Sequence, residues 1–577
     1  MARLTIPPNF TGTANADKIV GEELNASVAI GIDILTPGLI NTGSGKDTIE
    51  GTGVGNIGSS GTGGNDGNGS NGGTGTGIAN SGKLNAGNQE DTISGIGTGG
   101  DGGNAYSDDR YNSNYIGGKG GKGSKGTGIA NSGNLNTGYQ EAIISGIGTG
   151  GKGGNGGDDS GDGGEGEDGG TATGIANSGS LNTGNQEDII YGIGTGGDGG
   201  NGGEGEKYLG MGGDGGTGTG ITNSGKLNAG DGKNMIIGTG TGGKSGYGIG
   251  YIYDIGYSYG GTGTGIANSG NLNTGDQEDT INGTGTGGNG SDGRGFVGYG
   301  GYGGTGTGIA NSGNLNTGDG KDTINGTGTG GNGGQKSYEG DGGYGGTGIG
   351  IANSGNLNTG DGEDTINGIG TGGKGGKGDV GYGEAGAGTG IQNIKDATIT
   401  TGSGKDTITG YGNSSGENAT AYGIFNDGVI DTGNDYDRLT GQATTTIGGT
   451  AYGIYGKGTI NTGNGNDEII ATSIVAGVQQ KVSIGGGLTI DLGTGNDYLK
   501  GFGEATVDGG KGFDTLDLGA FKRSELIVSG VISGNTLNSA NISFNNNGNS
   551  ITLSTTGFEK FIFADSSFSY STLANGA

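Results

Sequence analysis

Residues 306–331 read GTGIANSGNLNTGDGKDTINGTGTGG, and close copies of this stretch return down most of the chain. Its apolar residues Ile309, Leu315 and Ile324 are separated by glycine and asparagine turns. Short apolar segments bounded by Gly and Asn are typical of strands, because a helix needs roughly ten or more periodic residues. Each copy therefore predicts three short strands, and stacking of the copies predicts an all-β parallel solenoid, a β-roll or β-helix of about a dozen coils.

The apolar positions recur and predict three columns of inward-facing side chains. The first contains Ile78, Ile129, Ile175, Ile221, Ile266, Ile309, Ile351, Ile391, Ile424 and Ile454. The second contains Leu84, Leu135, Leu181, Leu227, Leu272, Leu315, Leu357, Ile399, Ile430, Ile460 and Ile490, and the third contains Ile93, Ile144, Ile190, Ile236, Ile281, Ile324, Ile366, Ile408, Leu439, Ile469 and Leu499. Asparagine repeats in the same way, from Asn80 to Asn353 and from Asn85 to Asn358, and predicts amide ladders between the coils.

Composition separates this fold from its competitors. The 577 residues include 164 glycines and 3 prolines without a strict Gly-X-Y period, which excludes collagen. With 27% hydrophobic residues, a compact domain of this length could not offset the cost of ordering its backbone. A thin core, completed by the coils above and below, needs only a few apolar residues per coil.

The net charge and the absence of certain residue types limit the ligands and partners that the chain can bind. The formal charge is −30, which argues against nucleic acid and favours divalent cations. The chain has no cysteine and no histidine, so disulfides, zinc sites and His- or Cys-dependent catalysis are excluded. Carboxylates and backbone carbonyls remain, and these oxygens suit calcium (Ca2+). No apolar stretch is long enough for a transmembrane segment, and the start of the chain lacks the apolar region of a cleaved secretory signal.

A nonapeptide of the form T-G-x-G-x-D-x-I/L-x, as in TGDGKDTIN (317–325), couples a glycine turn to one carboxylate. One such turn supplies about half of a calcium shell, so two stacked turns are expected to complete a site. The predicted metal ligands are Asp47, Asp322, Asp364, Asp406, Asp437, Asp467, Asp497 and Asp514, together with the turn residues Gly433, Gly463, Gly465, Gly493, Gly495, Gly510 and Gly512. The alternative is that these aspartates only hydrogen-bond their own turns. The aspartate is lost at Ala142 and Asn234, where calcium should bind poorly.

The spacing of the aspartates divides the chain. They are 42 residues apart from Asp322 to Asp364 and 30 apart from Asp437 to Asp467. The difference lies in Gly-Gly-x inserts such as residues 150–170, which leave one corner of the solenoid as either disordered loops or packed extended polyglycine helices. We expect an N-terminal cap (1–40), long coils with inserts (41–400), short calcium-binding coils (401–518) and a C-terminal β cap (519–577). In the cap, residues such as Val528, Ile532, Phe544 and Phe561 are expected to cover the open end.

The last nonapeptide, GGKGFDTLD (509–517), matches every fixed position of G-G-x-G-x-D-x-U-x, where U is a large apolar residue. In this the chain resembles the RTX family of haemolysin-type calcium-binding repeats. Its longer repeats are also similar to those of oscillin-like surface proteins of filamentous cyanobacteria. The resemblance implies a secreted protein that folds on meeting extracellular calcium, with an uncleaved type I secretion signal near its carboxyl end.

These observations together predict a calcium-binding structural protein of the cell surface or extracellular matrix that self-associates into oligomers or filaments, with surface polysaccharide as a further candidate partner. Two other functions remain open. Ice or crystal binding is suggested by the T-x-T pairs of residues 239–241, 284–286 and 327–329. A polysaccharide-modifying enzyme on a β-helix would need clustered cations, but Arg3, Arg110, Arg294, Arg438 and Arg523 are scattered, so we expect no enzymatic activity.

Overall fold

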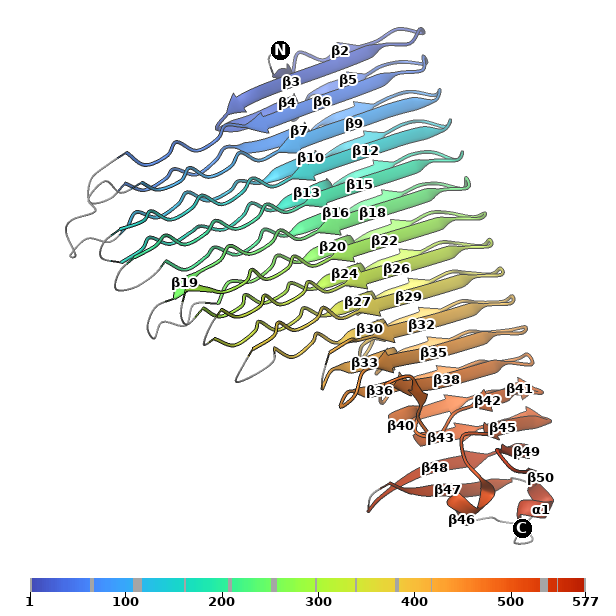
Figure 1. The fold of residues 1–577 in the computed structure, drawn as a ribbon. Coiled ribbons are helices and arrows are strands. Elements are labelled where there is room, and N and C mark those ends of the chain that lie inside the picture. Colours follow the sequence, from blue (N-terminus) through green and yellow to red (C-terminus); the bar gives the residue numbers. More distant parts are fainter. Residues whose placement is uncertain are drawn as a thin grey trace.

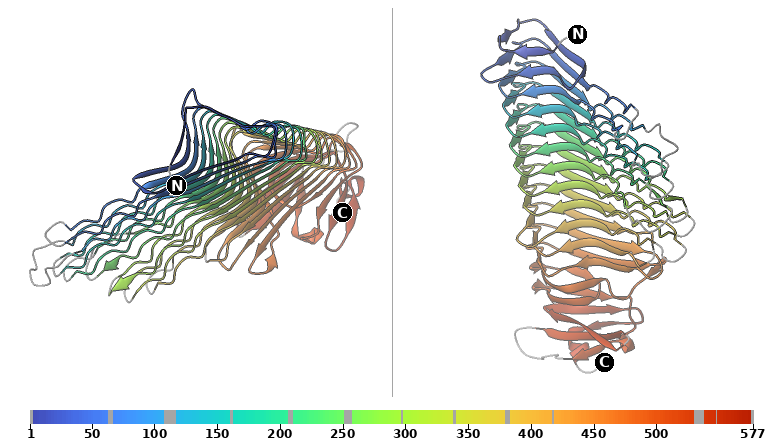
Figure 2. Two further views of the ribbon diagram at one scale, coloured as in Figure 1. Left: turned by 90° about the horizontal axis from the view of Figure 1, so that it is seen from above. Right: turned by 90° about the vertical axis from the view of Figure 1, so that its left-hand side faces the viewer.

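The computed structural model describes residues 3–62, 67–106, 117–159, 162–205, 210–250, 257–295, 298–337, 340–378, 383–416, 418–529, 538–546 and 548–574. The predicted parallel β-solenoid is confirmed. Coils stack from the N-terminus to the C-terminus, and each contributes three strands to two sheets that follow the whole stack (Figures 1 and 2). No helix in the described residues is long and apolar enough to cross a membrane.

The strands fall into three sets that pair in parallel with their own kind. The first set is β1 (Leu4–Ile6), β4 (Val28–Ile34), β7 (Thr74–Asn80), β10 (Gly126–Asn131), β13 (Ala172–Asn177), β16 (Gly218–Asn223), β20 (Gly263–Asn268), β24 (Gly306–Asn311), β27 (Gly348–Asn353), β30 (Gly388–Asn393), β33 (Thr420–Asn426) and β36 (Thr450–Tyr455). The second set is β2 (Phe10–Thr11), β5 (Leu39–Asn41), β8 (Lys83–Asn85), β11 (Asn134–Asn136), β14 (Ser180–Asn182), β17 (Lys226–Asn228), β21 (Asn271–Asn273), β25 (Asn314–Asn316), β28 (Asn356–Asn358), β31 (Thr398–Thr400), β34 (Val429–Asp431) and β37 (Thr459–Asn461). The third set is β3 (Lys18–Ala26), β6 (Thr48–Gly55), β9 (Asp91–Thr98), β12 (Ala142–Thr149), β15 (Ile189–Thr195), β18 (Met235–Thr241), β22 (Thr280–Thr286), β26 (Thr323–Thr329), β29 (Thr365–Thr371), β32 (Thr407–Asn413), β35 (Arg438–Thr445), β38 (Glu468–Val475), β42 (Tyr498–Lys500) and β45 (Asp514–Leu518).

The core is a narrow column between these strands. Pairing places Ile266, Ile309 and Ile351 directly above one another, and the same holds for Leu272, Leu315 and Leu357. Every residue of the three predicted apolar columns is buried. Since side chains alternate between the faces of a strand, this register is fixed: a slip by one residue would turn the isoleucines outward.

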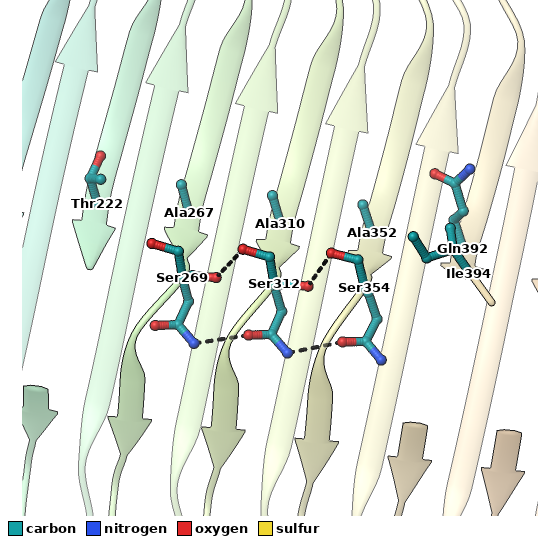
Figure 3. Close-up of a pocket in the computed structure, with 12 residues that line it drawn as sticks. Thr222, Ala267, Ser269, Ala310, Ser312, Ala352, Ser354, Gln392 and Ile394 are labelled. Atoms are coloured by element: carbon teal, nitrogen blue, oxygen red, sulfur yellow. Dashed lines mark hydrogen bonds between the residues drawn. The ribbon is translucent and has the colours of Figure 1, made fainter. Parts of the chain in front are cut away.

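Asparagine amides connect the coils, as the sequence predicts. In the buried ladder, Asn268 Nδ2 donates to Asn311 Oδ1 at 2.8 Å, and Asn311 Nδ2 donates to Asn353 Oδ1 at 2.9 Å (Figure 3). The second ladder points the other way, because Asn316 Nδ2 donates to Asn273 Oδ1 of the preceding coil. The two ladders therefore oppose one another along the solenoid axis.

The Gly-Gly-x inserts leave the solenoid on one side as a fringe of outward and returning limbs (Figure 1). In the outward limb, Gly99 and Gly102 donate to carbonyls of the next coil, at Thr149 and Lys152, whereas Gly100 and Gly103 donate to the returning limb of the preceding coil. The pattern repeats every three residues, as in an extended polyglycine helix. The described limbs of the inserts therefore pack as extended polyglycine helices and do not form disordered loops.

The C-terminal part closes the stack. It contains β39 (Val478–Gln479), β40 (Ile484–Asp491), β41 (Thr494–Gly495), β43 (Gly503–Asp508), β44 (Lys511–Gly512), a 3-10 turn at Arg523–Glu525, β46 (Ile527–Ser529), β47 (Ser539–Asn546), β48 (Asn549–Thr556), β49 (Phe558–Phe563), β50 (Ser567–Ser569) and α1 (Tyr570–Ala574); the short strands β19 (Ile249–Gly250) and β23 (Arg294–Gly295) pair within the fringe. Strand β48 pairs with β43 and β49 pairs with β45, so the cap covers the last coil. Val528, Phe544 and Phe561 pack as the sequence predicts, and Ile532 lies outside the described residues.

Candidate metal site

The predicted aspartates form one column at the start of the third strands. The backbone N–H of Asp437 donates to Oδ1 of Asp467, that of Asp467 to Oδ1 of Asp497, and that of Asp497 to Oδ1 of Asp514, each at 2.8 Å. The same bond joins the remaining predicted members of the column, which are Asp47, Asp322, Asp364 and Asp406, to the aspartate of the coil that follows. All eight side chains are buried.

The column is longer than the predicted set. Asp91 and Asp279 also lie in the column. Asp91 accepts from the backbone N–H of Asp47, and the backbone N–H of Asp279 donates to Asp322. Asp188 accepts from the backbone N–H of Ala142. Their nonapeptides carry glutamine in place of the second glycine, which is why the motif alone did not select them. The signal that could have included them is their position two residues before Ile93, Ile190 and Ile281 of the third apolar column.

The predicted glycines shape the turn before each aspartate. Gly433, Gly463, Gly493 and Gly510 have φ of 92°, 83°, 84° and 85°, a left-handed conformation that favours glycine. A Cβ on Gly493 would overlap the carbonyl oxygen of Gly463 in the coil above it. The second glycines of the turn, Gly465, Gly495 and Gly512, follow two residues later. Turns this tight aim backbone carbonyls at the enclosed side of the loop.

The second oxygen of each carboxylate is the unusual feature of the column. Among the described residues, Oδ2 is buried without a hydrogen-bond partner in Asp47, Asp91, Asp188, Asp279, Asp322, Asp364, Asp406, Asp437, Asp467, Asp497 and Asp514. Burial raises the pKa of Asp437 to about 8, that of Asp364 and Asp497 to about 7, and that of Asp467 to about 6. A buried oxygen without a partner is costly, so a column of them indicates that something else completes the site.

Asn234 shows what surrounds that oxygen. It occupies an aspartate position, and its Nδ2 donates to the carbonyls of Gly230 at 3.1 Å, Gly232 at 2.7 Å and Thr274 at 2.8 Å. The turns repeat, so we infer that the Oδ2 atoms elsewhere in the column lie near the equivalent carbonyls, which are acceptors. The nearest donor is the hydroxyl of the threonine before the turn, such as Thr432 beside Asp437, and this hydroxyl also bonds to the next coil. Such a site is suited to a cation or a proton.

The chemistry of these ligands fits a hard cation. One carboxylate oxygen and three carbonyls give part of the about six to eight oxygens that calcium takes, and the rest would come from the next turn or water. Among the described residues, no group of three or more Asp, Glu, His or Cys side chains is placed to hold a metal ion, so backbone carbonyls would have to supply most of the ligands. Coils are about 4.8 Å apart, and two ionised carboxylates at that separation repel by about 3.5 kcal/mol at an effective dielectric of about 20. Cations between the coils would remove this repulsion.

Two features of the site were not predicted. Buried threonines before the turn form their own column, in which the Thr432 hydroxyl donates to the Thr462 carbonyl and the Thr462 hydroxyl donates to the Leu492 carbonyl. At the C-terminal end, Glu559 of the cap accepts from the backbone N–H of Asp514 at 2.8 Å and so takes the place of a further aspartate. The repeated Thr before each glycine turn was a signal for the first feature. Nothing in the repeat pointed to Glu559.

No protein-family model, no curated protein and no solved structure matches the chain.

Proposed function

We propose that the chain is a secreted, calcium-binding structural protein of the cell surface or extracellular matrix, without enzymatic activity, in which calcium joins consecutive coils. The observation that carries the proposal is the column of buried Oδ2 atoms without a hydrogen-bond partner, together with Asn234, whose Nδ2 at the same position donates to three backbone carbonyls. The resemblance of residues 509–517 to RTX repeats supports the same assignment and suggests export through residues 519–577. Fusion of those residues to a reporter in a host with a type I secretion system tests the export route.

Calcium stoichiometry tests the site directly. In Asp467→Asn an NH2 group replaces the cation-binding oxygen, so the variant should bind at least one calcium ion fewer per chain than the parent. The reciprocal Asn234→Asp change should add capacity. The control is Asp396→Asn, because Asp396 is exposed and its φ of 68° suits asparagine equally well.

Native mass spectrometry at defined free calcium measures the three variants against the parent. Circular dichroism and melting temperature after exhaustive chelation test whether calcium stabilises the fold. Chelation should lower the melting temperature, because a ligand at about a thousand times its Kd adds about 4 kcal/mol of stability. Equal calcium content in the parent and Asp467→Asn, or a melting temperature unchanged by chelation, would contradict the proposal.

Ice or crystal binding is a second candidate, and one observation favours it. Thr239, Thr284 and Thr327 lie side by side on β18, β22 and β26, and Thr241, Thr286 and Thr329 form a parallel row two residues on. These rows give a regular array of threonine hydroxyls on the outer face of a sheet. Thermal hysteresis that is lost in Thr284→Tyr would establish this function, and its absence in the parent would dismiss it.

The arrangement of the arginines does not favour a polysaccharide-modifying enzyme. Among the described arginines, Arg3 pairs with Glu23, Arg438 pairs with Glu468, and Arg294 lies 3.8 Å from the centre of the Tyr247 ring. Arg110 lies outside the described residues. The paired arginines lie far apart along the stack and do not form a charge-neutralising cluster.

A further inference from the structure

A hollow of about 600 Å3 lies where the short coils meet the C-terminal cap. Tyr452 and Tyr455 of β36 line it on one side of β40, and residues of β43 and β48 line it on the other side. The volume falls within the about 300–1,000 Å3 that is usual for small-ligand sites. None of its lining residues belongs to the aspartate column.

The hollow exists because β40 carries three glycines in succession. Pairing between β40 and β43 shifts register between Ile484 and Leu488, and residues 485–487 take up the irregularity without side chains. Gly486 and Gly487 both have φ of 90°, which would be strained for other residues. A Cβ on Gly485 would press against the rings of Tyr452 and Tyr455. The glycines therefore keep the space open and let the rings lie against the backbone.

The aromatic wall is held firmly in place. The ring centroids of Tyr452 and Tyr455 are 4.9 Å apart, and Tyr455 also packs against Tyr422 at 5.2 Å and Phe425 at 6.0 Å. Both tyrosines of the hollow remain partly exposed. A tyrosine presents an apolar ring and a hydroxyl that donates and accepts hydrogen bonds. Such a wall suits a ligand with an apolar face and a polar edge.

The other side of the hollow is polar. Thr506 of β43 and Ser554 of β48 are neighbours on this side, because they are paired in the register of the two strands. Glu504 and Thr552 extend the same surface. Glu504 is exposed, and in the described part of the chain its carboxylate makes no hydrogen bond and no ion pair. A carboxylate can accept from two neighbouring hydroxyl groups, and threonine and serine hydroxyls both donate and accept. The lining contains no lysine or arginine, and the chain carries a formal charge of −30. An acidic ligand would therefore be repelled.

We propose that this hollow binds a neutral saccharide. One face of a sugar ring would lie on the Tyr452 and Tyr455 rings, and its hydroxyls would bond to Glu504 and to the hydroxyls of β43 and β48. This binding does not depend on the calcium proposal, because the two sites share no residue.

Three other hollows in the described part of the chain contain no aromatic side chain. The groove of Figure 3 has a volume of about 320 Å3 and is lined by alanines, serines and asparagines of successive coils, such as Ala310 and Ser312, without an aromatic ring. The tyrosines of the fringe, such as Tyr302 and Tyr344, stack with ring centroids 5.0 Å apart but line no described hollow with a carboxylate. Tyr302 therefore provides a matched control.

Isothermal titration of the calcium-loaded chain with neutral hexasaccharides of glucose, xylose and mannose, and with an acidic uronic-acid hexasaccharide, tests the proposal. At least one neutral probe should bind, and the acidic probe should bind more weakly. Tyr452→Ala and Glu504→Gln should each weaken binding at least about tenfold, and Thr506→Arg should block the hollow. Tyr302→Ala should bind as the parent does, and circular dichroism should show all four variants folded.

The result that would overturn the proposal is failure of every neutral probe to bind at millimolar concentration. Unchanged binding by Tyr452→Ala and Thr506→Arg, or preference for the acidic probe, would also overturn it. The calcium content of Tyr452→Ala should equal that of the parent, and Asp467→Asn should keep the saccharide affinity of the parent. Failure of one proposal is thereby distinguished from failure of the other.

Discussion

At the scale of single residues, the aspartate column joins fold and function because each carboxylate has two oxygens with different surroundings. Oδ1 accepts a backbone N–H from the coil above, as Oδ1 of Asp467 does from Asp437, and this bond alone would need only an Asx residue. Oδ2 is buried and has no hydrogen-bond partner. A proton or a cation can satisfy that oxygen, so acid and calcium should act on the same atoms.

The stability of the metal-free chain should therefore fall as pH rises. Burial raises the folded-state pKa of Asp437 to about 8 and that of Asp364 to about 7, against about 3.9 in the unfolded chain. The folded state then binds more protons between about pH 4 and pH 8. The stabilisation is complete below about pH 4 and is lost as pH rises through the folded-state pKa values. Melting temperatures in chelator should be lower at pH 8 than at pH 5, and saturating calcium should reduce the difference.

A matched pair separates the column from the overall charge. Asp437→Asn cannot lose a proton, so its metal-free melting temperature should change less between pH 5 and pH 8 than that of the parent. Asp396→Asn removes an exposed charge and should keep the slope of the parent. A metal-free melting temperature that rises from pH 5 to pH 8 would show that the column does not hold protons.

At the scale of the strands, the position of a side chain could be predicted from the sequence wherever the same residue type recurs at the same place in each repeat. Ile309, Leu315 and Ile324 lie in the predicted columns because only one register buries all three. The opposite directions of the asparagine ladders could not be predicted, because they depend on which carbonyl lies beneath each amide. The inserts were ambiguous for a related reason: the N–H of Gly102 is bonded to Lys152 of the next coil, so the order of one limb belongs to the stack and not to its own sequence. Glu559 lies outside the repeats, so no periodicity in the sequence indicated that it would end the aspartate column.

The buried asparagine ladder should contribute more to stability than a third, exposed ladder that runs through Asn271, Asn314 and Asn356. Asn311 Nδ2 donates to Asn353 Oδ1 and to the carbonyl of Asn356, and its Oδ1 accepts from Asn268. Asn311→Ala leaves buried partners without hydrogen bonds and should cost about 2–4 kcal/mol, at about 1–3 kcal/mol for each unsatisfied group. Asn314→Ala, in the exposed ladder, should cost about 0.5 kcal/mol or less. Denaturant titration and hydrogen exchange around β24 and β27 measure both. Equal effects of the two substitutions would mean that the buried amides are not structural.

At the scale of the whole molecule, the fringe is a second repeating surface beside the solenoid (Figure 2). On its outward limbs Asp101, Lys152, Asp198 and Lys244 follow one another from coil to coil, and the backbone N–H of Lys152 donates to Asp101 Oδ1. The charges thus alternate in sign over these four coils, and Asn289 and Asn332 occupy the position in the next two. Two copies packed antiparallel can place lysine opposite aspartate at several points, and a two-fold contact of this kind uses the same surface on both partners. Weak contacts that repeat in this way add together.

We therefore expect the chain to self-associate through the fringe, and more strongly with calcium, which would order the stack and reduce the repulsion that accompanies a formal charge of −30. Lys152→Glu combined with Lys244→Glu makes the outward face uniformly acidic and should shift the assembly toward monomer. Lys457→Glu changes the net charge by one reversed lysine at an exposed position away from the fringe and should have a smaller effect. Light scattering at millimolar calcium, repeated at about 0.05 M and about 0.5 M salt, measures the assembly, and the higher salt should weaken it because exposed ion pairs are screened. A monomeric parent at high protein concentration would refute self-association, and an oligomer unaffected by the double substitution would place the contact elsewhere on the solenoid.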